Sequence, residues 1–157
     1  GETINCAPFL TAAWAWASDG LHGRYAVGES GAVNINIAEY QALLNGALAH
    51  AEHPANTIHM YSDSSIAVDM FNYDLSEGTV PREARKHGLV SLTNEVIDLM
   101  QERCFVIEWV KGHRSHRLNQ IADSLSRLAR IRYNSGLSYP DFKTEADAIY
   151  RTFNLAI

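Results

Sequence analysis

The chain has 157 residues, of which 46% are apolar, and its formal net charge at pH 7 is −5. This length and apolar content suit one globular domain with a real core, and the negative charge argues against a broad electrostatic grip on nucleic acid. No apolar run approaches the ~18–20 residues that span a membrane, and no signal-peptide pattern opens the sequence. We therefore expect a soluble, cytoplasmic monomer with no membrane partner.

Turn signals and apolar runs predict strands in the N-terminal third of the chain. Thr11–Ser18 ends at the turn pair Asp19-Gly20, and Arg24–Glu29 follows it, so we expect these two strands to form a hairpin. Thr3–Cys6 precedes them and suffices only for a truncated strand.

Apolar residues then recur at the helical period, which predicts a helix over Ala38–His53 that Pro54 ends. A short strand over Ile58–Ser62 comes next. The aspartate and two serines at positions 63–65 follow it, and residues of these types favour the cap of a helix. We expect that helix over Ile66–Asn72.

The same rules predict the second half of the chain. Asn72–Pro81 is polar and interrupted by glycine and proline, so it is predicted to be a loop. The remaining predicted elements are a helix over Leu89–Met100, a strand over Cys104–Val110, a helix over Leu118–Ala129 and, in a separate tail at 134–157, a helix over Thr144–Phe153. This order predicts an α/β fold in which helices cover a mixed sheet.

Three acidic residues stand where functional sites gather in α/β folds. Glu39 lies in the first turn of the first long helix, Asp63 ends a strand, and Asp123 lies in the helix after the last strand. If these elements meet, the three anions repel one another, and Mg²⁺ or Mn²⁺ would relieve the repulsion. Two such ions about 3.5–4 Å apart activate water and hold a phosphate. A single acid at such a position is more often a helix cap or a partner of the helix dipole. A metal site is therefore indicated only if the three acids meet in the folded protein.

The basic residues and histidines allow several interpretations. The basic stretch comprises Lys111, His113, Arg114, His116 and Arg117, followed by Arg127, Arg130 and Arg132. A solvated helix face is the simpler explanation of this charge run. His113 is either a proton shuttle beside the helix of Asp123 or an ordinary surface histidine. Structural zinc is disfavoured because Cys6 and Cys104 form no CxxC pair, and a serine hydrolase is disfavoured because Ser64 and Ser65 lack a GxSxG turn.

The most specific pattern in the chain is the run Glu108–His113 (EWVKGH), which is followed by His116, Asn119 and Asp123. This run resembles the last strand, the histidine loop and the final helix of type 1 ribonucleases H. Its combination of tryptophan, lysine, glycine, two histidines, asparagine and aspartate at fixed spacings is highly specific.

Two weaker motifs precede that run in the order that the family has them. Ala38–Leu43 (AEYQAL) resembles the family's first helix, which carries its second catalytic acid, and Tyr61–Ser64 resembles the strand end that carries its third. The resemblance covers roughly residues 3–133. It implies an RNase H-like α/β fold with a mixed five-stranded sheet flanked by helices, in which 1–133 is the catalytic domain and 134–157 a C-terminal tail.

The resemblance also implies a function: an endoribonuclease that hydrolyses the RNA strand of RNA–DNA hybrids with two Mg²⁺ (or Mn²⁺) ions. Such an enzyme recognises the hybrid partly through 2′-hydroxyls in the minor groove. The implied metal ligands are Glu39, Asp63 and Asp123, with His113 as the assisting catalytic histidine; the implied substrate-binding residues are Asn36, Ser65 and Asn119, the last also supporting Asp123.

The sequence departs from the family in two places. The segment Asn72–Gly88 lacks the dense basic and aromatic residues of some relatives. More seriously, the family's first strand ends in an aspartate that binds metal, and the best match here is Asn5. Asparagine keeps an oxygen ligand but loses the charge, which weakens metal binding. Three explanations of the asparagine at this position are open: a natural variant with altered metal use, a deliberate inactivating substitution, or a misalignment, in which case Glu2 takes the place of the aspartate. The alternatives to an active enzyme are therefore a catalytically impaired nucleic-acid-binding module on the same fold, and another nuclease of the wider superfamily.

Overall fold

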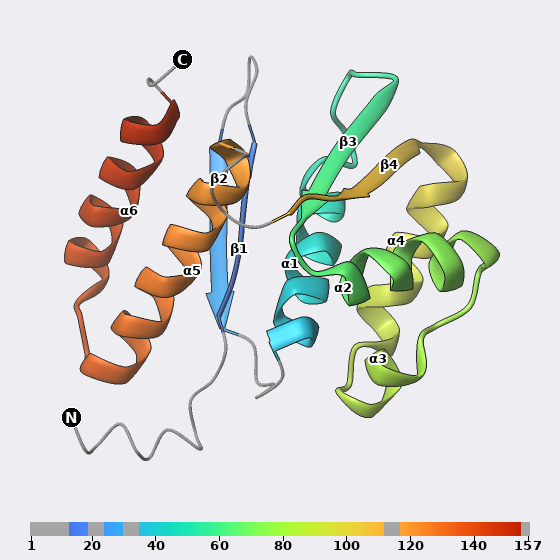
Figure 1. The fold of residues 1–157 in the computed structure, drawn as a ribbon, viewed down its shortest axis with the longest axis horizontal. Helices are drawn as coiled ribbons and strands as arrows, with labels where there is room; N and C mark the ends of the chain where they lie inside the picture. Colours follow the sequence, from blue (N-terminus) through green and yellow to red (C-terminus); the bar gives the residue numbers. More distant parts are fainter. Residues whose placement is uncertain (1–12, 19–23, 30–34, 112–116, 155–157) are drawn as a thin grey trace.

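The computed structural model describes residues 13–18, 24–29, 35–111 and 117–154 (Figure 1). Strands and helices alternate along the chain, so the α/β class expected from the sequence is confirmed. The elements in chain order are β1 (Ala13–Ser18), β2 (Arg24–Glu29), α1 (Ile35–Ala49), β3 (Thr57–Ser62), α2 (Ser65–Asp69), the π-helical turn η2 (Met70–Asp74), the 3₁₀ turn η3 (Leu75–Glu77), α3 (Arg82–Lys86), α4 (Val90–Glu102), β4 (Cys104–Trp109), α5 (Arg117–Ser135) and α6 (Tyr139–Asn154).

The predicted N-terminal hairpin is present. Strands β1 and β2 pair antiparallel, with Ser18 opposite Arg24 and Ala13 opposite Glu29. Helices α1 and α5 both contact β1, and Figure 1 shows them on opposite sides of the hairpin. The hairpin therefore fixes the spacing between the helix that carries Glu39 and the helix that carries Asp123.

Strands β3 and β4 form a second pair, which is parallel. Its register runs from Thr57 opposite Cys104 to Ser62 opposite Trp109. A parallel pair needs a crossover connection, and the helical segments from α2 to α4 supply it. Among the described residues the strands form two separate two-stranded sheets, so the expected five-stranded sheet is not seen there. The strand expected over Thr3–Cys6 lies outside the described residues.

Helix α1 is the centre of the larger core. It begins at Ile35 instead of the predicted Ala38 and ends at Ala49 instead of His53. The sequence predicted one apolar stripe, but the helix contacts β1, β3, α2 and α4 and is buried around most of its circumference. The buried residues are Ile37, Ala38, Tyr40, Ala42, Leu43, Leu44, Gly46 and Ala47.

The prediction of a loop over Asn72–Pro81 is wrong for its first half. The turns η2 and η3 continue α2 without a break, and Gly78, with φ of 79°, ends the helical segment. The short helix α3 was also not predicted. Polar residues dominate this stretch, which is why the sequence pattern resembled a loop.

The helical course of η2 and η3 follows from long-range packing. Phe71 and Leu75 are 0% and 2% exposed, and both belong to the core cluster around α1. The Asn72 Nδ2 donates a hydrogen bond to the carbonyl of Ile107 in β4 at 3.1 Å. Two buried anchors and one cross-chain hydrogen bond therefore outweigh the polar composition.

Helices α5 and α6 form a second core cluster. Helix α5 continues through position 133 to Ser135, and α6 begins at Tyr139, earlier than the predicted start at Thr144. The buried residues between them are Ile121, Leu125, Leu128, Phe142 and Ala146. Figure 1 shows α6 on the side of α5 that faces away from the hairpin. No helix in the described ranges combines the length and the apolarity needed to cross a membrane.

Candidate active site

Asp63 follows the end of β3, where hydrogen bonds from Trp109, the last residue of β4, and from Val110, which follows it, hold the backbone of residues 62 and 63. The Val110 amide donates to the Ser62 carbonyl at 2.9 Å. The indole Nε1 of Trp109 donates to the Asp63 carbonyl at 3.1 Å. Because both bonds use main-chain carbonyls, the carboxylate of Asp63 takes no part in either of them.

The next residue caps helix α2. The Ser64 Oγ accepts a hydrogen bond from the Ala67 amide at 3.1 Å, and the Ser64 amide donates to Ser62 Oγ at 3.1 Å. The helix cap predicted for positions 63–65 is therefore Ser64. This assignment removes the simplest structural explanation for Asp63, because the N-cap position is already taken.

Glu39 faces the same region from helix α1. The prediction that Glu39 lies in the first turn of this helix is wrong, because α1 begins at Ile35 and no acidic residue lies in its first turn. Glu39 therefore serves neither as a cap nor as a first-turn dipole partner. The Ser62 Oγ donates to Glu39 Oε2 at 3.5 Å. Burial, followed by the charges of Asp63 and Asp123, raises the pKa of Glu39 from 4.5 to about 7, against a smaller lowering by the Ser62 hydrogen bond.

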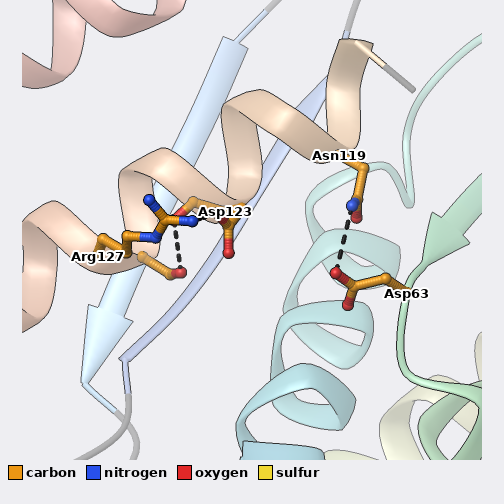
Figure 2. A network of polar contacts seen from close by, with 5 residues as sticks. Asp63, Asn119, Asp123 and Arg127 are labelled. Carbon is orange, nitrogen blue, oxygen red and sulfur yellow. Dashed lines mark hydrogen bonds and ion pairs between the residues drawn. The ribbon is translucent and has the colours of Figure 1, made fainter. Parts of the chain in front are cut away.

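Helix α5 contributes two side chains to this region (Figure 2). The Asn119 Nδ2 donates to Asp63 Oδ2 at 3.4 Å, which joins α5 to the end of β3. One turn further along, Asp123 Oδ2 forms an ion pair with Arg127 Nη2 at 2.6 Å. The helix therefore presents an amide to one acid and carries another.

The three acids predicted from the sequence thus share one electrostatic environment. Asp63 and Asp123 both contribute to the raised pKa of Glu39, so Glu39 is near enough to each of them for their charges to act on it. Their oxygen atoms do not yet surround a common point: in the described ranges, no group of three or more His, Cys, Asp or Glu side chains is arranged to hold a metal ion. Figure 2 shows Asp123 beside Arg127 and Asp63 beside Asn119.

A family model described as RNase H matches residues 10–131. The chain belongs to the RNase H family. The protein named Ribonuclease H from Tropheryma whipplei (strain Twist) is 28% identical over 126 residues, which are 78% of this chain and 76% of that protein. The Ribonuclease H of Helicobacter acinonychis (strain Sheeba) is 34% identical, and the Ribonuclease HI of Helicobacter pylori (strain ATCC 700392 / 26695) is 32% identical, each over 54% of this chain and 58% of the relative. No solved structure matches.

Membership of the RNase H family confirms the resemblance that the EWVKGH run indicated, and with it the enzyme class, a ribonuclease H. The matched range contains Glu39, Asp63 and Asp123, whereas Asn5 precedes it. Asn5 and His113 both lie outside the described residues. Their assigned roles therefore stay predictions.

The residues predicted to bind substrate in this RNase H lie at element ends around the acids. Asn36 stands at the start of α1, where its Oδ1 accepts a hydrogen bond from Ser64 Oγ at 3.0 Å. Ser65 is the exposed first residue of α2. Asn119 is only 9% exposed, and the contact it makes with Asp63 was not expected. Contact of these side chains with a hybrid remains a prediction.

The donor set suits the divalent ions that the resemblance implies. Glu39, Asp63 and Asp123 offer hard oxygen ligands, which Mg²⁺ and Mn²⁺ prefer. The raised pKa of Glu39 shows that its negative charge is opposed by burial and by the other two acids. A cation bound among these carboxylates would offset their mutual repulsion and stabilise the ionised form of Glu39. The residues present therefore fit such ions.

Sequence reasoning missed three side chains of this RNase H site. Ser62 holds Glu39, Trp109 holds the backbone of Asp63, and Arg127 holds Asp123. Only the last had a usable signal, because an acid and a base four residues apart on a helix are neighbours. The other two contacts join residues distant in the chain, and no local pattern predicts them.

The electrostatics of Glu39 predict a pH-dependent stability of the metal-free protein. Because the folded-state pKa is raised to about 7 from 4.5, the contribution of Glu39 is most favourable below pH 4.5 and is lost as pH rises through 7. The total loss is at most about 3 kcal/mol. We expect Glu39→Gln to be more stable than wild type in EDTA at pH 8, with a much smaller difference at pH 5. Thermal unfolding of both proteins at the two pH values measures this, and an equal difference at both would contradict it.

Proposed function

We propose that the protein is an endoribonuclease that hydrolyses the RNA strand of RNA–DNA hybrids and uses two Mg²⁺ or Mn²⁺ ions bound by Glu39, Asp63 and Asp123. The observation that carries this proposal is a pair of hydrogen bonds, from Ser62 to Glu39 and from Asn119 to Asp63, which link α1, the end of β3 and α5 inside the range matched by the RNase H family model. The charges of Asp63 and Asp123 also raise the pKa of Glu39. The relatives named above are ribonucleases H, which supports the same substrate class.

The chain's own residues hold and orient the acids in this proposal. The Ser62 hydroxyl orients Glu39 Oε2, and the Asn119 amide orients Asp63 Oδ2. When bound, divalent cations activate the attacking water, hold the scissile phosphate and stabilise the leaving oxygen. His113 assists by moving a proton during hydrolysis or product release.

Recognition of the hybrid is assigned to residues around the acids. Asn36 and Ser65 lie at the starts of α1 and α2, next to Glu39 and Asp63 in the chain. Side chains of these types hydrogen-bond to base edges and to 2′-hydroxyls in the minor groove, which distinguishes an RNA strand from a DNA strand. We expect this binding to be weak and salt-sensitive, because the segment Asn72–Gly88 lacks the dense basic and aromatic residues that some relatives have there.

A binding module without efficient cleavage is the second candidate, and Asn5 is the residue that favours it. If Asn5 stands where the family has its first aspartate, one negative ligand is missing and the ions are held less tightly. A third candidate, another nuclease of the wider superfamily, has less support because the EWVKGH run is specific to ribonucleases H.

A cleavage assay distinguishes the three candidates. The full chain is incubated with a labelled RNA–DNA hybrid, with the matching RNA and DNA duplexes, and with Mg²⁺ or Mn²⁺. We expect cutting of the RNA strand of the hybrid alone. Binding of the hybrid without cutting would favour the binding module, and cutting of DNA would favour the other nuclease.

The proposal also covers the number of strands in the sheet, the domain bounds, the cellular location and the oligomeric state. We infer a five-stranded sheet, to which a strand over Thr3–Cys6 contributes beside the four strands seen. We also infer a catalytic domain over 1–133 with the tail 134–157 following it, and a cytoplasmic protein that acts as a monomer. Gel filtration and light scattering test the oligomeric state.

A further inference from the structure

Arg127 lies against one of the three acids. Its Nη2 is 2.6 Å from Asp123 Oδ2, and the two residues are four apart on α5 (Figure 2). The side chain of Asp123 is 22% exposed, whereas that of Arg127 is 62% exposed. The guanidinium is therefore held at the acid while much of the arginine side chain remains in water.

An arginine in this position competes directly with a cation. A guanidinium that donates to a carboxylate oxygen occupies lone pairs that a metal ion would use, and its charge repels a nearby divalent ion. The Asp123 carboxylate lies beside Arg127 (Figure 2). This contact fits a site at which the guanidinium and a divalent cation would compete for the same carboxylate.

We propose that Arg127 is an internal counter-ion of Asp123 that a divalent cation displaces, so that Arg127 sets the cation concentration at which the site fills. This inference rests on the proposed function, because it requires Asp123 to be a metal ligand. Without a cation, the guanidinium offsets the repulsion among Glu39, Asp63 and Asp123. When a cation binds, the exposed arginine moves into water, and the modest cost of breaking this ion pair is the amount by which Arg127 weakens cation binding.

Thermal unfolding of the full chain tests the proposal without relying on activity. Wild type, Arg127→Gln and Arg130→Gln are compared in EDTA and across a Mg²⁺ titration. Arg130 is exposed on the same helix, so its substitution makes the same charge change away from the Asp123 ion pair. We expect the half-saturating Mg²⁺ concentration of R127Q to be about two- to fivefold lower than that of R130Q. In EDTA, R127Q should unfold at a lower temperature than R130Q, and saturating Mg²⁺ should close this gap.

The controls separate the failure of this inference from the failure of the proposed function. Equal Mg²⁺ midpoints for the two arginine variants, with a wild-type response that Asp63→Asn abolishes, would overturn the inference alone. The ion pair would then be an ordinary contact along the helix surface. A wild-type protein that Mg²⁺ does not stabilise, or a D63N variant that responds like wild type, would overturn the proposed metal site and the inference together.

Discussion

Asp63→Asn is expected to reduce cleavage of an RNA–DNA hybrid by at least about 1,000-fold, equivalent to about 4 kcal/mol of activation free energy. The substitution keeps the shape of the side chain but removes a negative charge from the group that is proposed to bind two cations. Initial rates of hybrid cleavage in Mg²⁺, at equal concentrations of folded protein, measure the effect. Undiminished turnover in D63N would remove Asp63 from the mechanism.

The fold of D63N should be unaffected, and the reason lies in the contacts around it. Trp109 bonds to the backbone carbonyl of Asp63, and Ser64 caps α2, so neither contact depends on the carboxylate. The Asn119 hydrogen bond does reach the carboxylate, but an asparagine at position 63 keeps a side-chain oxygen that can accept it. Asp98→Asn is a matched control, because Asp98 is an exposed acid on α4 and its substitution makes the same charge change. The control should retain the wild-type rate. Equal losses in D63N and D98N would assign the effect to overall charge.

The elements that the sequence predicted well are those with strong local signals. The bounds predicted for the strand Arg24–Glu29 are those observed, and β4 ends at Trp109, next to the predicted Val110. Turn residues and alternation are properties of neighbours in the chain, so they can be read from it. The course of η2 and η3 could not be predicted, because burial of Phe71 and Leu75 against distant helices determines it.

The same distinction between local signals and long-range contacts applies to the candidate site. Motif order was sufficient to select Glu39, Asp63 and Asp123. It could not show that Glu39 is buried beside the other two acids, because that environment arises only when α1, β3 and α5 meet. The four-residue spacing of Asn119 and Asp123 predicted a shared helix face, but the contact of Asn119 with Asp63 crosses from helix to strand end.

Phe142→Ala is expected to lower the free energy of unfolding by about 3–5 kcal/mol. The Phe142 side chain is 4% exposed and packs in the cluster that joins α6 to α5. Its ring also lies 5.4 Å from the Arg132 guanidinium, which adds a cation–π contact. Urea unfolding measures the change, with Glu145→Ala as the control because Glu145 is exposed on the same helix. A loss below about 1 kcal/mol would contradict the packing argument.

Phe142→Ala also tests whether α6 helps to position Asp123 in addition to stabilising the fold. Asp123 lies between Ile121 and Leu125 on α5, and both of these residues are buried in the cluster with Phe142. Loosening α6 should therefore let the Asp123 helix move, so that F142A, while still folded, needs more Mg²⁺ than E145A for the same fractional stabilisation. An unchanged Mg²⁺ midpoint would mean that α6 stabilises α5 without positioning the acid. Because the RNase H family match ends at 131 and α6 begins at Tyr139, a shifted midpoint would extend the functional unit beyond the matched range.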